Sequence, residues 1–421
     1  PTSHQQQSPK PRSSHPRQPS WHHSPRFWCD RRCDRFGLMK RITVAPRPDW
    51  QSEMARIGFN YHSIDGNYWQ EDACYVFTES QIDLLEDATN TLHHMYVQAV
   101  AHVVKTGDYA RLGIDDIAAK QIEDSFGRQA PSLYGRFDLC FDGINPPKLY
   151  EYNADTPTAL FEASVAQWYW LQAQGGILRG ADQFNSIHER LLVEFESLKP
   201  MLGHDTLYLT AASDSIEDLT TTQYLQDVAI QAGLQTDYID IGNIGYCMSD
   251  GQFTDLNDNI IHHLFKLYPW EWLLAEEFGQ HIASSNIHLI EPAYKLLMSN
   301  KALLTVLWEM FPNHPNLLAA SLNPNDISTN VVKKPFFSRE GANISLTHAN
   351  QTLSTHGQYG QEGYVYQESK PLPKFSNNQG QDVFAVIGSW IIGHSAAGIG
   401  IREDSTLITK DTSLFVPHAF I

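Results

Sequence analysis

The chain has 421 residues, of which 42% are hydrophobic and 19% are charged. This length and composition allow two or three globular domains with real cores. The formal net charge of −18 at pH 7 argues against nucleic acid and anionic membranes as main partners. The sequence has no apolar run of about 18 residues, so it predicts no transmembrane helix.

Residues 1–38 differ from the rest because they are rich in Pro, Ser, His, Gln and Arg. This composition predicts disorder, and the stretch lacks the apolar core of a secretory signal. Met39 opens MKRITVAPRPDW, which has the character of a native start, so we expect residues 1–38 not to be native. Their seven Lys and Arg and two Asp give +5, which leaves about −23 on the remainder.

The cysteines are odd in number and scattered, which predicts reduced thiols and a cytoplasmic protein. They are Cys29, Cys33, Cys74, Cys140 and Cys247. The first two lie in CDRRC near His22 and His23, a set that can in principle hold zinc. Its spacing matches no zinc-finger pattern, so we favour the interpretation that no zinc site is present.

The first strong structural signal is a long amphipathic helix over residues 78–105, with Thr78 as its N-cap. Alternation over residues 133–143 then predicts a strand that ends in an Asp-Gly turn. Residues 148–153 alternate in the same way and follow at hairpin distance. The sequence therefore predicts a β-hairpin after the helix.

The two hairpin strands carry polar side chains on one face. Arg136 and Asp138 share a face of the first strand, and Glu151 and Asn153 share a face of the second. Carboxylate and amide oxygens are hard ligands that suit Mg2+. A polar strand end that turns into a helix cap would explain Glu151 and Asn153 alone. The clustering of four such residues favours a metal site.

A helix is predicted directly after the hairpin, with Asp155 or Thr156 as its cap, Pro157 in the first turn and residues 158–174 as its body. The free N–H groups at its start would attract an anionic group. Further on, the aromatic-rich residues 265–272 are predicted to be core.

Residues 207–241 predict a strand over 207–210, a helix, and a second strand from about 236 to 241. This is the βαβ unit of a parallel sheet. The loop at residues 210–218 follows the carboxyl end of the first strand, where open α/β sheets bind ligands. It lacks the Gly-X-Gly-X-X-Gly pattern of dinucleotide-binding loops, which weakens that interpretation.

Three cations in the C-terminal half are candidates for phosphate contacts. Lys301 lies in the first turn of a helix predicted to be capped by Ser299 or Asn300. A cation there opposes the helix dipole and needs another reason to be present, although a surface lysine remains an alternative. Lys334 ends a β-branched strand before the small polar loop 338–341, which suits phosphate, although a hairpin turn would look similar.

The third cation, Arg402, ends the second of two strands predicted within residues 384–404. Another alternating strand is predicted within residues 363–375. Together, a carboxylate–amide cluster, three cations and a glycine loop suit a Mg-nucleotide held between two lobes. Phosphoryl transfer requires such positioned cations because they neutralise charge on the transferred group.

Several of these motifs resemble, in the same order, the synthetase domain of the glutathionylspermidine synthase family. They are RFDLCFDG, LYEYNADTPTALFE, KKPFFSREGANI, YQE and AGIGIRED…SLFVPH. The resemblance covers about residues 39–421 and is greatest to stand-alone acid–amine ligases that lack the amidase domain. It implies an α/β (α+β) chain with an ATP-grasp fold and a preceding α/β substrate-binding (pre-ATP-grasp) domain.

The resemblance also implies roles for individual residues. The implied Mg2+ ligands are Asp138, Glu151 and Asn153. The implied ATP-binding residues are Lys301, Lys334, Gly341, Gln367 and Glu368. Arg136 and Arg402 match catalytic arginines, and Thr156 and Glu217 match positions that contact the acid substrate. The segments around residues 213–218 and 265–272 depart from the family pattern, so the identity of the acid stays open.

The expected division of the chain has four parts. Residues 1–38 are the extension, residues 39–205 carry the metal-binding hairpin, residues 206–298 form the α/β substrate domain, and residues 299–421 form the nucleotide-binding part.

The resulting hypothesis is a Mg2+- and ATP-dependent carboxylate–amine ligase that forms an amide through an acyl phosphate. A peptide-like acid resembling glutathione and a polyamine-like amine are the substrates that the resemblance implies. The expected partners are these small molecules, with no nucleic acid and no membrane; the sequence does not give the oligomeric state. The alternatives are a nucleotide-binding regulatory protein of the same fold without turnover, and a kinase or ATPase that stops at phosphoryl transfer.

Overall fold

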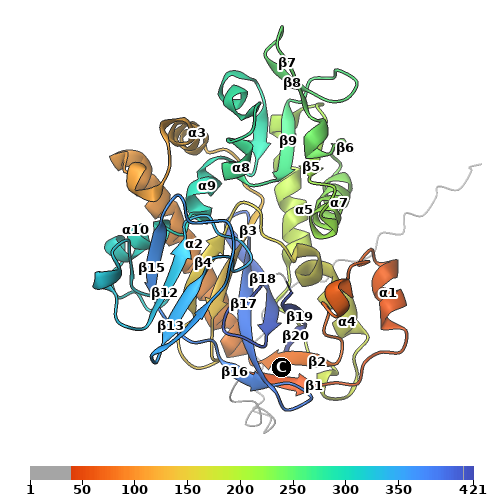
Figure 1. Ribbon diagram of the computed structural model, residues 1–421. Helices are drawn as coiled ribbons and strands as arrows, with labels where there is room; N and C mark the ends of the chain where they lie inside the picture. Colours follow the sequence, from red (N-terminus) through yellow and green to blue (C-terminus); the bar gives the residue numbers. More distant parts are fainter. Residues whose placement is uncertain (1–38, 411) are drawn as a thin grey trace, which may run out of the picture. The chain divides into compact units, whose positions relative to one another are not determined.

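A computed structural model describes residues 39–421 except residue 411. The predictions for residues 1–38, including disorder and the zinc alternative, lie outside these described residues. Within residues 39–421, Figure 1 shows a parallel sheet (green) above two antiparallel sheets, one of blue strands and one of blue and yellow strands. The α/β class predicted from the sequence is thus confirmed.

The largest sheet combines strands from distant parts of the chain, in the order β19-β18-β17-β3-β4, with β16 on β17. The predicted hairpin is present, because β3 pairs antiparallel with β4, and β3 also pairs antiparallel with β17. The strands are β3 (Tyr134–Cys140), β4 (Lys148–Asn153), β16 (Lys374–Ser376), β17 (Asp382–Ile392), β18 (Ser395–Asp404) and β19 (Leu414–Val416).

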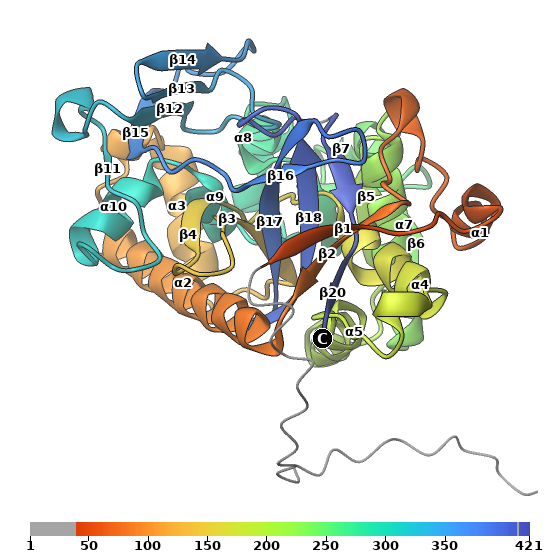
Figure 2. The same ribbon diagram turned by 90° about the horizontal axis from the view of Figure 1, so that it is seen from below.

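The long helix α2 (Glu79–Thr106) lies against β17 and β18 (Figure 2). Its start is as predicted, because Thr78 and Gln81 form a capping box in which each side chain accepts the other residue's N–H. The Tyr96 ring of α2 packs on Phe137 and Tyr152. Because strand side chains alternate between faces, the polar residues of the hairpin project from the face opposite α2.

The predicted βαβ unit belongs to a four-stranded parallel sheet of order β10-β9-β5-β6. Helix α7 (Ile216–Gln231) joins β5 to β6 and packs on β5. The second strand of the unit ends at Tyr238 rather than Ile241, because Asp240 caps a short 3-10 turn by accepting from the Gly242 N–H. The strands are β5 (Leu207–Ala211), β6 (Thr236–Tyr238), β9 (His263–Leu267) and β10 (His288–Ile290).

A five-stranded antiparallel sheet has the order β11-β15-β12-β13-β14. Together with the β3–β4 hairpin, it lines the candidate site that is described below. The strands predicted before Pro335 and within 363–375 are present as β12 and β15. The sheet consists of β11 (Ala320–Ser321), β12 (Val331–Pro335), β13 (Ser345–His348), β14 (Gln351–Ser354) and β15 (Tyr364–Glu368).

The remaining elements complete the described part of the chain. A three-stranded sheet contains β1 (Lys40–Thr43), β2 (Ala73–Phe77) and β20 (His418–Phe420), and a hairpin contains β7 (Gly245–Cys247) and β8 (Gln252–Thr254). The other α-helices are α1 (Trp50–Arg56), α3 (Asp116–Gly127), α4 (Gln167–Gln172), α5 (Ile187–Ser197), α6 (Lys199–Leu202), α8 (Trp270–Leu273), α9 (Tyr294–Ser299) and α10 (Leu303–Met310). Among the described helices, none has the length and apolarity that a membrane crossing requires.

Two predicted helix starts are wrong. The helix after the hairpin begins at Leu160, because Ala159 has a φ of +64° and Asp155 is engaged elsewhere instead of capping. Ser299 is the last residue of α9 rather than a cap, and α10 begins at Leu303. Lys301 therefore lies in the turn between two helices. Asp155 and Ser299 make tertiary contacts in place of the capping bonds that the sequence suggested, whereas the other predicted cap, Asn300, accepts locally from the Ala302 N–H over 2.8 Å in the turn before α10.

Candidate active site

The floor of the site is the β3–β4 hairpin. Across it, Arg136 lies opposite Asn153 and Asp138 lies opposite Glu151. The register shifts by one residue immediately after Asp138, a bulge of the kind that redirects side chains next to active sites. The structure therefore brings together, on one face, the four polar residues that the sequence singled out.

Arg136 and Asp138 form a buried ion pair. The Arg136 Nε and Nη2 donate to the two carboxylate oxygens of Asp138 over 2.7 and 3.2 Å, and its Nη1 donates to the Thr158 carbonyl over 2.7 Å. Burial opposes the charge on Arg136, but the carboxylate of Asp138 outweighs this and raises the pKa of the guanidinium. Both charges are therefore fixed in place at the floor of the site.

Two lysines from outside the hairpin converge on Glu151. The Lys301 Nζ lies 3.3 Å from Glu151 Oε2 and donates to the Ser338 carbonyl over 2.6 Å. The Lys334 Nζ donates to the Tyr150 carbonyl over 2.9 Å. Burial opposes ionisation of Glu151, but the charges of Lys301 and Lys334 outweigh it and hold its pKa at about 2. Glu151 is therefore an ionised carboxylate between two cations.

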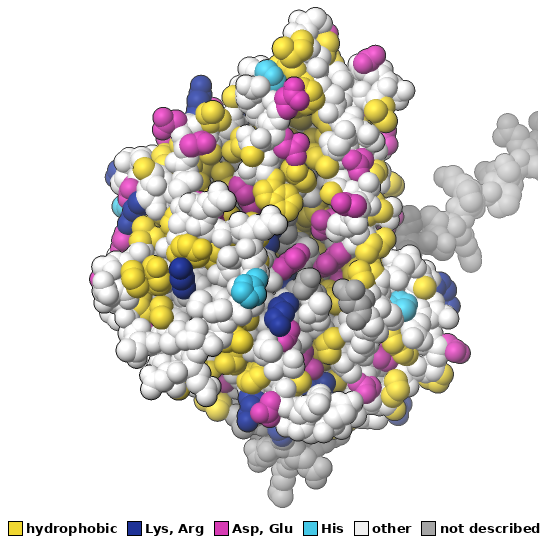
Figure 3. Space-filling view, in the orientation of Figure 1, with side chains coloured by type: hydrophobic (Ala, Val, Ile, Leu, Met, Phe, Trp, Pro, Cys, Tyr) yellow, Lys and Arg dark blue, Asp and Glu magenta, His cyan; other side chains and the backbone are white. Residues whose placement is uncertain are grey.

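A pocket of about 700 Å³, including the part open to solvent, lies over these charges. The predicted residues that line it are Asp138, Glu151, Lys334, Gly341, Gln367 and Glu368. Apolar side chains, among them Val332, Ile344 and Leu346, line another part of this pocket and supply the apolar surface that a planar nucleobase would require. Figure 3 shows this face of the molecule, where Lys/Arg and Asp/Glu side chains lie side by side near its centre.

Gln367 links β12 of the five-stranded sheet to the hairpin. Its Oε1 accepts from Lys334 Nζ over 2.8 Å, and its Nε2 donates to the Leu149 carbonyl over 3.0 Å. Gly341 needs its missing side chain, because its φ is +68° and a Cβ would lie 2.5 Å from the Thr409 carbonyl oxygen. Loop 338–341 thus closes against the loop that follows β18.

A second, smaller pocket of about 280 Å³ adjoins the first through Ser338. It is lined by Asn153, Thr156, Glu271, Ser299, Lys301, Phe337, Ser338 and Arg339. Arg339 donates to the Thr156 hydroxyl and, over 3.0 Å, to Glu271, while its buried Nε has no partner among the described residues. A buried guanidinium with a free N–H beside the larger pocket has the chemistry to bind a carboxylate.

Arg402 and Glu217 lie at the margin of this arrangement. Arg402 pairs with Val386 across β17 and β18, which places it on the same sheet face as Arg136 and Asp138, but it lines neither pocket and donates to the Lys410 carbonyl. Glu217 accepts from the Ala159 N–H over 3.2 Å. The roles of Arg402, Glu217 and the other predicted site residues stay predictions.

Beside Glu217 lies a group of further acids. Glu162 is fully buried within a π-helical turn, accepts from the Tyr68 hydroxyl over 2.6 Å, and keeps Oε2 without a partner among the described residues. Burial and, second, the charge of Glu217 raise its pKa to about 7. Burial and Glu217 also raise the pKa of Asp218 to about 6. This side of the site is therefore rich in carboxyl groups, and two of them hold their protons more tightly than an exposed carboxyl group does.

The hairpin donor set fits a magnesium ion. Asn153 Nδ2 donates to Asp138 Oδ2 over 3.3 Å and to Glu151 Oε1 over 3.2 Å, so all three side chains converge on one point. An ion in that position would replace the two N–H bonds and turn the amide so that its oxygen faces the ion. Among the described residues, no group of three His, Cys, Asp or Glu side chains offers an alternative site.

Some residues of the site had no role assigned from the sequence. For Arg339 the sequence predicts only a place in the polar loop 338–341, and for Asp155 it predicts only one of two possible helix caps. Lys266 lies in the segment that was predicted to be core, and it is indeed fully buried. Its charge in an apolar strand was the signal of an ion pair, because a buried lysine requires a partner.

Comparisons with known proteins show what the chain resembles. The family model described as glutathionylspermidine synthase preATP-grasp matches residues 41–421. A provisionally named acid–amine ligase of Haemophilus influenzae is 43% identical over 399 residues, which is 91% of this chain and 100% of that protein. The bifunctional glutathionylspermidine synthetase/amidase of Escherichia coli is 26% identical over 402 residues, which is 87% of this chain and 63% of that one.

Trypanothione synthetase of Crithidia fasciculata is 24% identical over 352 residues, which is 77% of this chain and 53% of that enzyme. The chain thus spans the whole of one relative and less than two thirds of the other two. Among solved structures, a glutathione synthetase-like effector of Globodera pallida matches 83% of this chain and 89% of its own, with a TM-score of 0.54 at 8% identity.

The structural likeness concerns the fold alone, and it supports the predicted ATP-grasp architecture. The match of the family model extends over nearly all described residues, and the relative at 43% identity is covered in full. This chain therefore belongs to the glutathionylspermidine synthase family.

Proposed function

We propose that this chain is an ATP-dependent carboxylate–amine ligase that joins a small acid to a small amine. One observation carries the proposal most directly. The two pockets meet at Ser338, so that a site for phosphates and metal adjoins a site with a free guanidinium N–H. The names of the relatives, which are ligases of acids and amines, support the same reaction class.

The reaction has two steps. A carboxylate oxygen of the acid attacks the γ-phosphorus of ATP, ADP leaves, and an acyl phosphate forms. The amine then attacks the acyl carbon, loses a proton and expels phosphate, which leaves an amide. Phosphoryl transfer requires mainly positioning and charge neutralisation from the protein.

The residues around the two pockets divide this work. Lys334 and Lys301 would neutralise phosphate oxygens, and Gln367 and Glu368 line the part of the pocket that suits adenine. Asp138, Glu151 and Asn153 would hold Mg2+, which supplies further charge neutralisation when bound. Arg136 would act at the transferred phosphoryl group. Arg402 would do so after its contact with the Lys410 carbonyl is released.

The acid and the amine would approach from the side of Thr156 and Arg339. Arg339 suits the acid, since it would exchange its bond to Glu271 for a substrate carboxylate. The acids around Glu217 suit a cationic amine, and a polyamine is the class that their number favours. Glutathione is one peptide-like candidate for the acid.

The direct test is a substrate screen. Purified protein is incubated with MgATP, a panel of amino acids and peptides, and a panel of amines, and ADP and amide products are measured. We expect ADP release that requires both substrates. Hydroxylamine in place of the amine should give a hydroxamate together with ADP, because hydroxylamine attacks an activated acyl group and ADP rather than AMP is the product when that group is an acyl phosphate.

The two alternatives give different outcomes. Tight MgATP binding with no ADP or amide across broad panels would identify a regulatory nucleotide-binding protein. ADP release without a hydroxamate would identify a kinase or ATPase. The domain boundaries and the cytoplasmic location stay part of this proposal, and the oligomeric state is left open.

A further inference from the structure

The segment Ala154–Asp155 joins the two halves of the site. It follows Asn153, the last residue of the predicted metal cluster, and precedes Thr156, which lines the smaller pocket. The Asp155 residue is 1% exposed and Lys266 is 0% exposed. A buried carboxylate at this position therefore lies between the metal-binding hairpin and the substrate pocket without lining either pocket.

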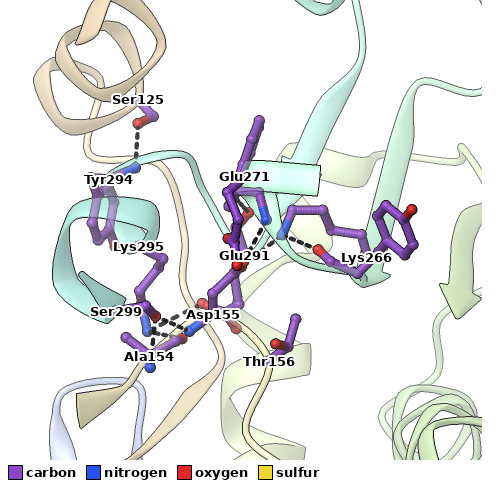
Figure 4. A network of polar contacts seen from close by, with 12 residues as sticks. Ser125, Ala154, Asp155, Thr156, Lys266, Glu271, Glu291, Tyr294, Lys295 and Ser299 are labelled. Atoms are coloured by element: carbon purple, nitrogen blue, oxygen red, sulfur yellow. Dashed lines mark hydrogen bonds and ion pairs between the residues drawn. The ribbon is translucent and has the colours of Figure 1, made fainter. Parts of the chain in front are cut away.

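Polar groups of this segment are bonded from three directions (Figure 4). The Asp155 Oδ1 accepts from Lys266 Nζ over 2.6 Å, and its Oδ2 accepts from the Trp270 N–H over 2.8 Å. The Ser299 hydroxyl oxygen accepts from the N–H groups of both Ala154 and Asp155 over 3.0 and 2.9 Å.

The Lys295 Nζ completes this set by donating to the Ala154 carbonyl over 3.2 Å. The segment is thus held by β9, α8 and α9, which are elements of another part of the chain. The same contacts reach the substrate side, because Trp270 precedes Glu271, the ion-pair partner of Arg339. A shift of Asp155 would therefore move Asn153 and Thr156 together.

The buried ion pair of Asp155 and Lys266 is not expected to contribute much to the stability of the fold. Removing two charges from water costs much of what their attraction returns, so a buried ion pair is weak evidence for a stabilising role. It is well suited to fixing geometry, because the carboxylate accepts from Lys266 and Trp270 in defined directions.

We propose that Asp155 and Lys266 are a positioning pair that sets the Mg2+ affinity of the hairpin by fixing Asn153. The proposal takes MgATP as the ligand from the proposed function, and otherwise rests on the contacts above. Neither residue lines either of the two pockets. Their effect passes through the main chain of Ala154 and Asn153.

The test measures metal binding rather than turnover. Mg2+ is titrated into protein saturated with the ATP analogue AMP-PNP, and the affinity for AMP-PNP without metal is measured separately. We expect Asp155→Asn and the double variant D155N/K266M to raise the apparent Kd for Mg2+ at least fivefold, while metal-free AMP-PNP affinity changes less than twofold. The double variant removes both charges, so it decides the question if the single variant fails to fold.

The matched control is Glu71→Gln. Glu71 is a buried carboxylate paired with Arg47 at 2.7 Å, and it lines neither pocket. We expect it to lower the thermal unfolding midpoint without changing Mg2+ affinity. Wild-type Mg2+ affinity in the folded double variant, or an equal loss in the control, would overturn the positioning role. Absence of ligase products would overturn the proposed function and leave this result intact.

Discussion

Glu151 is the residue on which most of the proposed chemistry depends. Its carboxylate lies between Lys301 and Asn153, and Lys334 lies close enough to help hold its pKa at about 2. Since this pKa is below the usual range of a glutamate, its ionisation contributes stability that is present above about pH 4.5 and lost as the pH falls toward 2. At neutral pH, the side chain is a fixed negative charge.

The variant Glu151→Gln removes this charge at nearly constant volume. We expect ligase turnover to fall at least 100-fold while the fold survives, because the cluster loses a metal ligand but no bulk. Circular dichroism and thermal melting would establish the fold, and ADP release would measure turnover. Near wild-type turnover would mean that Glu151 is only a strand end, and the metal assignment would then be wrong.

Lys333 and Lys334 are neighbours with different surroundings. Lys334 lines the larger pocket, whereas the Lys333 Nζ lies 3.8 Å from the centroid of the Tyr364 ring. We expect Lys334→Ala to weaken ATP binding at least tenfold and Lys333→Ala to change it less than threefold. Calorimetric titration with ATP and Mg2+ would measure both. Equal losses would show that the wrong lysine was chosen.

Lys334 also predicts a pH dependence. Burial, and to a lesser degree the charge of Lys301, lower its pKa to about 8, against the opposing effect of Glu151. Only the protonated side chain attracts phosphate, so ATP affinity should decrease as the pH rises through about 8. The variant Lys334→Arg stays charged and should show a flatter profile between pH 7 and 9. The same slope in both proteins would assign the titration to another group.

At the scale of elements, the site depends on how β17 supports the hairpin. Gly388 of β17 lies opposite Asp138, and a Cβ there would be 2.8 Å from Arg136 Cδ. Arg136 cannot easily move aside, because its guanidinium is bonded to both Asp138 and the Thr158 carbonyl. The absent side chain of Gly388 therefore makes room for the side chain of Arg136.

The variant Gly388→Ala should displace Arg136 without breaking the sheet, since alanine is compatible with an extended backbone. We expect turnover to fall about tenfold or more, in line with a 1–2 kcal/mol loss of transition-state stabilisation. The thermal midpoint should move by only a few degrees. Gly175→Ala is the control, because nothing lies within 4 Å of its Cβ position. Equal activity of both variants would contradict this role of Gly388.

At the scale of the whole molecule, the net charge of the protein has the same sign as the charge of its proposed co-substrate. The chain after residue 38 carries about −23, although its proposed co-substrate is an anion. Part of this charge lies at the start of α7, where Asp214, Glu217 and Asp218 follow β5. Acidic surfaces of this kind concentrate cations, although dispersed charge that serves solubility would have the same total.

Salt dependence separates these two explanations. If the acids steer a polyamine, the apparent KM for a spermidine-like amine should rise with added salt, because charges are screened over about 8–10 Å near physiological ionic strength. The KM for a charge-neutral amine should stay constant. Steady-state kinetics between low and high NaCl would measure both. Identical salt dependence would remove the steering explanation and leave the ligase proposal unaffected.

The sequence by itself determined those elements whose formation depends on interactions between residues that are close together in the chain. The helix after Thr78 was predictable because its capping box lies within four residues, and the hairpin was predictable because alternation and an Asp-Gly turn are both local signals. The polar face of that hairpin followed from the same alternation. The family resemblance added the ligand roles that no periodicity contains.

Only the tertiary structure decided which distant residues meet. Asp155 was predicted to cap a helix, but the competing partner Lys266 lies far along the chain and its charge requires a buried carboxylate. Lys301 was expected in a helix, yet it occupies a turn where it reaches both Glu151 and loop 338–341. Such contacts arise from the packing of separate sheets. No local pattern in the sequence gives the distance between residues of separate sheets. These contacts are therefore decided only when the whole chain is folded.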